Sequence, residues 1–321
     1  MQTCTISVVI CVYTEDRWDH IRAAVDSVRA QTLPSSETIV VVDYNPVLYK
    51  RLVAALPDDV TVVENRDAKG LSGGRNTGAA LAQGEIVAFL DDDATADPDW
   101  LRHLVEDYAN PDITGIGGLT LPKWQTMRPS WMPDEFLWVV GSNYRGMPPS
   151  GAPVRNLFGG NMSFRREVFE LVDGFQADIG RAEGGLPLGD EETLFCIKIS
   201  QQRPEAVFIM EHRAKIWHFV PDSRCRFSYF ASRCWAEGIS KALLTSYVGS
   251  GDGLSDERSY VTRTLPLGVI RGVTDFLRGD VTGLGRAGAI VAGLSVTAAG
   301  YLRGKLRQKV QSPSLAQHQA A

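Results

Sequence analysis

Three consecutive aspartates, Asp91, Asp92 and Asp93, directly follow the apolar run Ile86–Leu90. Three adjacent carboxylates repel one another, so in a folded protein they require either a cation or free access to water. Hard divalent ions prefer oxygen ligands, and Mg²⁺ or Mn²⁺ commonly joins one or two carboxylates to the phosphates of a substrate. The aspartates therefore indicate either a divalent-cation site facing a phosphorylated ligand or a solvated acidic loop at the end of a strand.

Three further features can carry chemistry, and each also has a purely structural explanation. Arg75 stands behind Gly73-Gly74 at the start of a predicted helix, where it either reaches a diphosphate or nucleobase or is an ordinary surface arginine. The acidic triplet Asp190–Glu192 opens another predicted helix, whose dipole alone would stabilise it there. His218 ends a predicted strand and is either structural or a metal ligand.

The first 120 residues alternate β-branched, strand-like runs with segments of helical periodicity. This alternation predicts an α/β fold with a mostly parallel, doubly wound sheet and helices on both faces. Ligands of such sheets bind at the carboxyl ends of the strands, which is where the three aspartates fall. The predicted strands are Ile6–Val12, Thr38–Val42, Val60–Glu64, Ile86–Leu90 and Ile113–Gly117, and the predicted helices are Trp18–Ala30, Val47–Leu56, Ser72–Ala82 and Pro98–Tyr108, the last with Asp97 as its N-cap.

The regular pattern breaks between Leu121 and Pro153, a stretch of this length that typically forms a lid or a binding loop. Its tryptophans either stack on a sugar face or belong to the core. Regular structure is expected again from residue 161 to residue 244, followed by a linker at Gly249–Asp256 and one or two helices. The tryptophans are Trp124, Trp131 and Trp138; the later elements are Asn161–Phe169, the helix Glu191–Gln201, strands at Ala206–Met210 and Ala214–His218, the helix Ser228–Leu244 and the helical segment Arg263–Arg303.

Composition limits the classes of function. The 321 residues are 44% hydrophobic and 22% charged with a net charge of −5, which gives no reason to expect a nucleic-acid partner. The five cysteines lack metal-ligand spacing, and no signal sequence is apparent, so we expect reduced thiols and a cytoplasmic protein. Residues 281–321 contain five basic residues and no acidic one, so this end either is solvated or rests on the inner face of an anionic cell membrane.

Five sequence blocks occur in an order and at spacings that resemble the family 2 glycosyltransferases, which adopt the GT-A fold. The resemblance covers about three quarters of the chain, from Ser7 to Leu244. The blocks are Ser7–Tyr13 with Val40–Asp43, the glycine-rich Gly70–Gly78, Phe89–Asp93, Gly159–Arg166 and Asp190–Glu192.

The resemblance implies a donor site for a nucleotide sugar. It assigns Tyr13, Thr14, Glu15 and Asp43 to the nucleoside, Arg75 and Asn76 of the glycine-rich block to the donor, and Gly160 and Asn161 to the donor sugar and acceptor. Asp91 and Asp93 match the family's DxD motif, with Asp93 as the direct metal ligand, Asp91 or Asp92 nearer ribose and base, and His218 as a further ligand of Mn²⁺ or Mg²⁺. The chain departs from the family at Tyr44-Asn45-Pro46, where an acidic or amide residue is usually followed by Gly-Ser.

The resemblance also implies an inverting transfer of the sugar from a donor, UDP-linked by expectation, to a glycan, lipid-linked or small-molecule acceptor in cell-envelope glycan synthesis. The acidic triplet aligns with the family's catalytic pair, which makes Glu192 the base, with Glu191 the alternative register. Two other functions remain open, a sugar-1-phosphate nucleotidyltransferase and a non-catalytic sugar-binding protein. We expect four regions: 1–120 for the donor, 121–250 for acceptor and catalysis, 251–307 as a membrane-associated helical extension, and 308–321 as a disordered tail.

Overall fold

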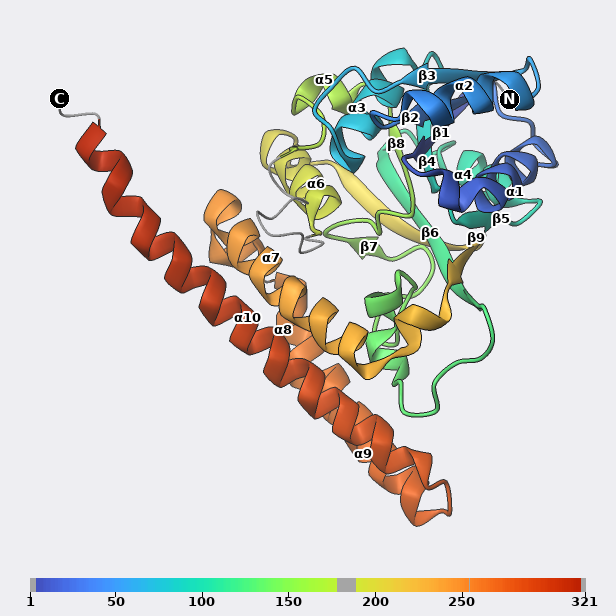
Figure 1. Ribbon diagram of the computed structural model, residues 1–321. Coiled ribbons are helices and arrows are strands. Elements are labelled where there is room, and N and C mark those ends of the chain that lie inside the picture. The colour runs from blue at the N-terminus through green and yellow to red at the C-terminus, as the bar shows by residue number, and fades with distance from the viewer. Residues whose placement is uncertain (1–3, 178–188, 254, 319–321) are drawn as a thin grey trace.

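The computed structural model describes residues 4–177, 189–253 and 255–318 (Figure 1). The elements alternate between strands and helices from β1 to β4, as the sequence pattern predicts. The strands are β1 Ile6–Val12, β2 Glu37–Val42, β3 Val60–Glu64, β4 Ile86–Asp91, β5 Ala94–Ala96, β6 Ile113–Trp124, β7 Pro153–Val154, β8 Asn161–Arg165 and β9 Val207–Val220. The α-helices are α1 Trp18–Arg29, α2 Pro46–Ala55, α3 Leu71–Leu81, α4 Trp100–Asp107, α5 Val168–Leu171, α6 Glu191–Gln202, α7 Phe227–Gly253, α8 Ser255–Ser259, α9 Leu265–Leu277 and α10 Thr282–His318.

The strands form one sheet in the order β3-β2-β1-β4-β8-β6-β9-β5, with β7 paired to β9. The first four strands are parallel, as predicted, because each is joined to the next by a helical crossover. The second half is mixed, since β8 enters antiparallel between β4 and β6. The carboxyl end of β4, which carries the aspartates, thus lies beside the start of β8.

Two apolar layers enclose the sheet. Alternate residues of β1 face opposite sides, so that Val8 and Ile10 join one layer while Val9 joins the other. The first layer is completed by α1, α2 and α4, and the second by α3, α5 and α6. Helices therefore cover both faces of the sheet, and the polar side chains lie between these helical layers, where the strands end.

Four local predictions differ from the structure. Asp97 is not the N-cap of α4, which begins two residues later behind Asp99, because the amide of Trp100 is bound by the Asp97 carbonyl in a turn. The two strands predicted between residues 206 and 218 are one strand, β9. The irregular stretch from Leu121 begins with the end of β6 and contains the 3₁₀ helix η2, Asp134–Val140. The linker at Gly249–Asp256 is mostly helical, with a break only at Gly249, whose φ is +81°.

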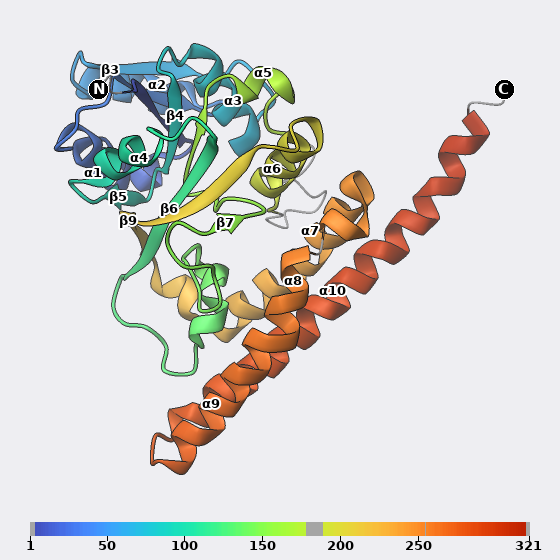
Figure 2. The same cartoon turned by 180° about the vertical axis from the view of Figure 1, so that it is seen from behind.

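A third apolar cluster joins η2 to α7, α9 and α10. Trp131 packs on Phe227 and Phe230, and Trp138 donates its indole N–H to the Tyr260 hydroxyl at 3.1 Å, so these rings belong to the core and not to a sugar-stacking lid. The helices run along one side of the molecule, away from β3 (Figures 1 and 2). α10 continues beyond Gln308, where the sequence predicts a disordered tail, to His318. Among the described residues, no helix combines the length and the apolar character needed to span a bilayer.

Candidate active site

Asp91, Asp93 and His218 meet at the end of β4. Their ligand atoms all lie within 4.8 Å of one another, and the His218 Nε2 is 3.2 Å from the Asp93 Oδ1. β5 brings them together, because it runs antiparallel to β9 and pairs Ala94 with His218. The Nδ1 of His218 is buried without a hydrogen-bond partner in the described chain. Two carboxylates and an imidazole at this spacing suit Mn²⁺ or Mg²⁺.

Asp92 is not part of this group. Asp91 is the last residue of β4, and Asp92 and Asp93 form the turn that leads to β5, in which Asp91 and Asp93, but not Asp92, come together with His218. Asp92 is buried and forms an ion pair with Arg17, whose guanidinium also lies 3.1 Å from Asp93. Burial, opposed by Arg17, raises the pKa of Asp92 to about 7. Burial also acts on Asp93, but the hydrogen bond from His218 and the charges of Arg17 and Arg224 outweigh it and lower the pKa of Asp93 to about 2. Asp93 is thus the ionised member.

Two glycines join this group to the second acidic cluster. A Cβ on Gly160 would lie 2.6 Å from the Asp91 Oδ2, and a Cβ on Gly159 would lie 3.4 Å from the Glu192 carboxylate. The backbone at Gly159-Gly160 therefore passes between Asp91 on one side and Glu192 on the other. A side chain at Gly160 would displace the Asp91 carboxylate. The arrangement leaves the group of Asp91, Asp93 and His218 and the Glu192 carboxylate on adjacent walls.

Glu191 and Glu192 have different environments although they are neighbours. Glu191 is buried and accepts from the Arg75 Nη1 at 2.9 Å, while the Arg75 Nη2 donates to the Gly159 carbonyl. Arg75 is itself only 2% exposed, so it is not an ordinary surface arginine, and its Nη2 lies 3.8 Å from the Asp91 Oδ1. Glu192 is half-buried and has no side-chain partner among the described residues. Burial and the charges of Glu191 and Asp190 raise the pKa of Glu192 well above its usual value.

Asp190 belongs to a buried ion cluster at the start of α6. Its Oδ1 lies 2.7 Å from the Lys241 Nζ, and Lys241 also contacts Glu237 at 3.3 Å and Glu257 at 3.0 Å. Glu257 in turn accepts two hydrogen bonds from Arg155. Asp190 sits at a φ of +76° just before α6. The cluster fixes the start of α6, and hence Glu192, against α7 and α8.

Replacing Lys241 with methionine should destabilise the protein by about 3–5 kcal/mol, because buried carboxylates would lose their counter-charge. Urea denaturation measures this, with Lys241→Arg as the matched control that keeps the positive charge. A loss below about 1 kcal/mol, in the range of an exposed ion pair, would show that the cluster does not hold α6.

The residues assigned to the nucleoside lie around the ends of β1 and β2. Tyr13 is exposed, Thr14 accepts from the Asp16 amide, and Glu15 accepts from the Asn45 side chain at 2.9 Å. Asp43 uses its Oδ1 to accept from Asn65 and from the Gly70 amide at 2.8 and 2.9 Å. The departure at Tyr44-Asn45-Pro46 has a structural use, since Asn45 caps α2 by accepting from the Leu48 amide.

Two predicted donor residues have their side chains committed elsewhere. Asn161 is fully buried, accepts from the Trp100 indole at 2.8 Å and donates to the Ala214 carbonyl at 3.1 Å. Asn76 exchanges hydrogen bonds with the backbone of Phe175. Both amides therefore hold the loops around the site.

The sequence pattern did not reveal that Arg17, Asn65 and Lys241 contribute to the site. Arg17 balances the aspartates, Asn65 joins Asp43 to the Asp67–Ala68 turn, and Lys241 holds Asp190. Each is distant in sequence from its partner, so spacing could not reveal it. For Arg17 and Lys241, the unbalanced acidic clusters were the available signal, since buried carboxylates call for a nearby cation.

The sequence of this chain is similar to a protein family and to several named proteins. The family model described as "Glycosyl transferase family 2" matches residues 7–172. A glucosyl-dolichyl phosphate glucuronosyltransferase of Haloferax volcanii is 37% identical over 242 residues, which cover 74% of this chain and 77% of that protein. The succinoglycan biosynthesis protein ExoM of Rhizobium meliloti is 24% identical over 260 residues, 78% of each chain.

Two solved structures share the fold. A mannosyltransferase of Pyrobaculum calidifontis, in complex with GDP-Man and Mn²⁺, has a TM-score of 0.56 at 17% identity and covers 92% of this chain and 88% of its own. GalNAc-T7 with UDP, GalNAc and Mn²⁺ has a TM-score of 0.50 at 18% identity, over 76% of this chain and 50% of its own. Both are GT-A folds, as is this chain.

Proposed function

The chain belongs to glycosyltransferase family 2 and is therefore a glycosyltransferase, and we propose that it transfers a sugar with inversion from a UDP-linked donor to an acceptor hydroxyl. The observation that carries this proposal is the position of Glu192 across the Gly159-Gly160 backbone from the Asp91, Asp93 and His218 group. One side of that backbone suits a diphosphate and the other suits an attacking hydroxyl.

The donor half of the site would hold a divalent cation, Mn²⁺ or Mg²⁺, through Asp91, Asp93 and His218. When bound, such an ion neutralises the negative charge that develops on a departing diphosphate. Tyr13, Thr14, Glu15 and Asp43 would bind the nucleoside, with the exposed Tyr13 ring and the second oxygen of Asp43 available to the base. Gly160 would let the backbone approach the donor sugar closely.

Glu192 would act as the general base. It takes the proton from the acceptor hydroxyl, whose oxygen forms a bond to the anomeric carbon as the bond from that carbon to the diphosphate oxygen breaks. The electron pair of the broken bond leaves with the nucleoside diphosphate. The raised pKa supports this role, since a base is most effective when its pKa approaches the working pH. The pairing of Glu191 with Arg75 favours Glu192 over Glu191.

The proposed acceptor is a lipid-linked glycan at the inner face of the cell membrane. The relative from Haloferax volcanii is named for a dolichyl phosphate substrate, and it aligns with three quarters of this chain. The basic C-terminal region supports a peripheral position at that surface.

A screen of UDP-, GDP- and dTDP-sugars for hydrolysis with and without Mn²⁺ tests the proposal. Release of nucleoside diphosphate from one donor, dependent on the metal, is the expected result. Production of a nucleoside triphosphate from sugar-nucleotide and pyrophosphate would instead identify a nucleotidyltransferase. Binding of sugars without turnover of any donor or acceptor would leave a sugar-binding protein.

A further inference from the structure

Large apolar side chains are exposed mainly on the C-terminal helices. Contiguous exposed apolar surface on a soluble protein usually marks a site of interaction with a partner or a membrane. The helices α9 and α10 form a hairpin along one side of the molecule (Figures 1 and 2). Its exposed apolar residues are Leu267, Ile270, Val273, Phe276, Leu277, Val281, Leu284, Val291, Leu302 and Leu306, which we call the apolar hairpin surface.

Helix α9 buries Leu265 at its start, but beyond it most of its large apolar residues face outward and its glycines face inward. Gly268 and Gly272 are buried, and a Cβ on Gly272 would lie 2.6 Å from the Gly283 carbonyl of α10. Ile270 is 61% exposed and Leu277 is 77% exposed. An ordinary surface helix has the opposite arrangement, with its large apolar stripe facing the core. The contact between α9 and α10 therefore does not account for the apolar residues of α9.

Helix α10 exposes an uncharged face over its first five turns. Between Leu284 and Leu302 the sequence contains a single charged residue, Arg286, which is bound by Asp275 and Asp280. The exposed positions on this face carry Leu, Gly, Val, Ser and Ala. A helix that met only water would be expected to carry charged residues there.

Basic residues accompany the apolar hairpin surface. From residue 260 to residue 309 the sequence has eight basic and two acidic residues. Arg263, Arg278, Arg303 and Arg307 form no ion pair with a carboxylate of the described chain, so their charges are available to an anionic partner. Apolar side chains beside unpaired cations are typical of helices that lie in the interface of an anionic membrane.

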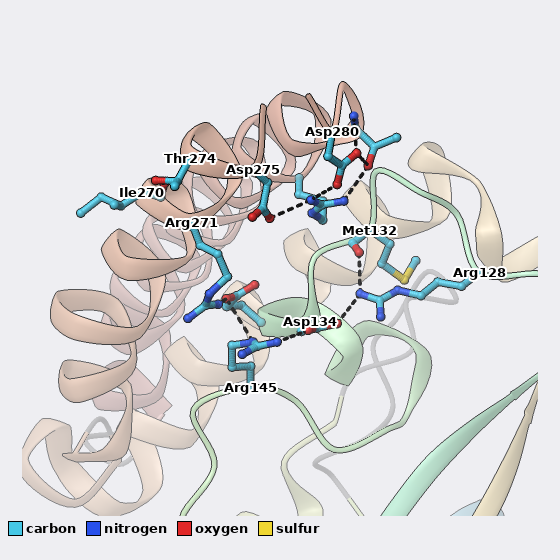
Figure 3. Close-up of polar contacts among 12 residues, drawn as sticks. Arg128, Met132, Asp134, Arg145, Ile270, Arg271, Thr274, Asp275 and Asp280 are labelled. Atoms are coloured by element: carbon cyan, nitrogen blue, oxygen red, sulfur yellow. Dashed lines mark hydrogen bonds and ion pairs between the residues drawn. The ribbon is translucent and has the colours of Figure 1, made fainter. Parts of the chain in front are cut away.

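An ion pair and the third apolar cluster join the hairpin to η2. Arg271 of α9 lies 2.6 Å from the buried Glu135 of η2, and Arg145 lies 3.7 Å from the same carboxylate while it also pairs with Asp134 (Figure 3). These side chains line a cavity of about 380 Å³ between η2 and the hairpin. At its other end η2 leads to Gly141, where a Cβ would lie 2.9 Å from the His218 ring. The hairpin is thus fixed in position relative to the site.

We propose that the apolar hairpin surface docks on an anionic lipid bilayer. The choice of a membrane as the partner of this surface rests on the proposed function, since a lipid-linked acceptor is presented at a membrane. The large side chains of α9 and α10 enter the boundary between headgroups and acyl chains, while the unpaired arginines lie against the phosphates. The contacts of the hairpin with η2 then set the distance of the donor site from the membrane.

Sedimentation with lipid vesicles tests the docking. The full chain should sediment with vesicles of phosphatidylglycerol and phosphatidylcholine in equal parts and much less with phosphatidylcholine alone. The double variant Ile270→Glu/Leu277→Glu should lower vesicle binding by about tenfold or more, because two apolar side chains lose their burial. The matched control Val47→Glu/Val53→Glu, which makes the same replacement at exposed apolar positions of α2, should bind as the wild type does.

Three readouts separate the possible outcomes. Equal melting temperatures of the two variants show that both fold, and unchanged metal-dependent hydrolysis of the donor in Ile270→Glu/Leu277→Glu separates docking from the transfer reaction. A wild type that stays in solution with both vesicle types would overturn the proposal. So would a wild type that is dimeric without vesicles and becomes monomeric in the double variant, because a second copy would then cover this surface.

Discussion

Replacing Glu192 with glutamine should lower the rate of glycosyl transfer by about 10²–10⁴-fold, the usual contribution of a general base. The amide has nearly the same shape but cannot take the acceptor proton. Donor binding should change little, because the cation-binding group lies across the Gly159-Gly160 backbone from this side chain. Single-turnover transfer and donor affinity, measured on the same variant, give the two quantities.

The neighbouring variant Glu191→Gln is the control. Glu191 faces Arg75, so this change should reduce stability while leaving a larger share of the transfer rate. If Glu191→Gln abolished transfer and Glu192→Gln did not, the base would be Glu191. If neither changed the rate, the acidic cluster would have no catalytic role.

The pH dependence has a definite sign. A carboxylate whose pKa is raised stays protonated to a higher pH, and only its ionised form can act as a base. The value of kcat/KM should therefore rise with pH through the raised pKa of Glu192. Residual activity of Glu192→Gln should lack this rising limb.

Replacing Asp93 with alanine should abolish metal stimulation and reduce donor turnover by about a hundredfold or more, since a metal contributes several kcal/mol to stabilising the leaving group. Asp93 is the ionised, buried carboxylate next to His218. Hydrolysis of the donor over a range of Mn²⁺ concentrations measures the effect.

Asp92→Asn is the matched control for this change. Asp92 is turned toward Arg17, and the amide keeps its shape and a hydrogen-bonding oxygen. It should retain stimulation by Mn²⁺. Equal losses in Asp92→Asn and Asp93→Ala would mean that the triplet acts only through its total charge.

The periodicity of the sequence predicted the parallel half of the sheet well, because buried strands such as Ile6–Val12 and the crossover helices carry strong local patterns. It predicted the structure poorly where a segment pairs or packs with residues that are distant in the sequence. The junction of β6 and β9 and the antiparallel entry of β8 depend on pairings across the sheet that no local pattern encodes. The same holds for η2, whose aromatic residues pack on helices that begin about ninety residues further along the chain.

The candidate site, too, could be predicted only in part from the sequence. Sequence order brought out Asp91, Asp93 and His218, which the structure brings together. It could not show that Asp92 pairs with Arg17 instead of joining His218, because that ion pair links residues 75 positions apart in the turn after β4. It also could not show that the side-chain amides of Asn161 and Asn76 form hydrogen bonds with Trp100 and Phe175. An asparagine can serve equally well in a buried hydrogen bond or in a contact with a ligand, so the residue type alone does not tell the two apart.

The central claim is that Asp91, Asp93 and His218 hold a divalent cation against the diphosphate of the donor. Melting curves of the wild type with UDP, with Mn²⁺, and with both test it most directly, since a ligand that binds only the folded state raises the melting temperature. UDP and Mn²⁺ together should raise the melting temperature by more than the sum of their separate effects. This additional rise should be absent from Asp93→Ala. An equal rise with UDP alone, or an undiminished rise in Asp93→Ala, would contradict it.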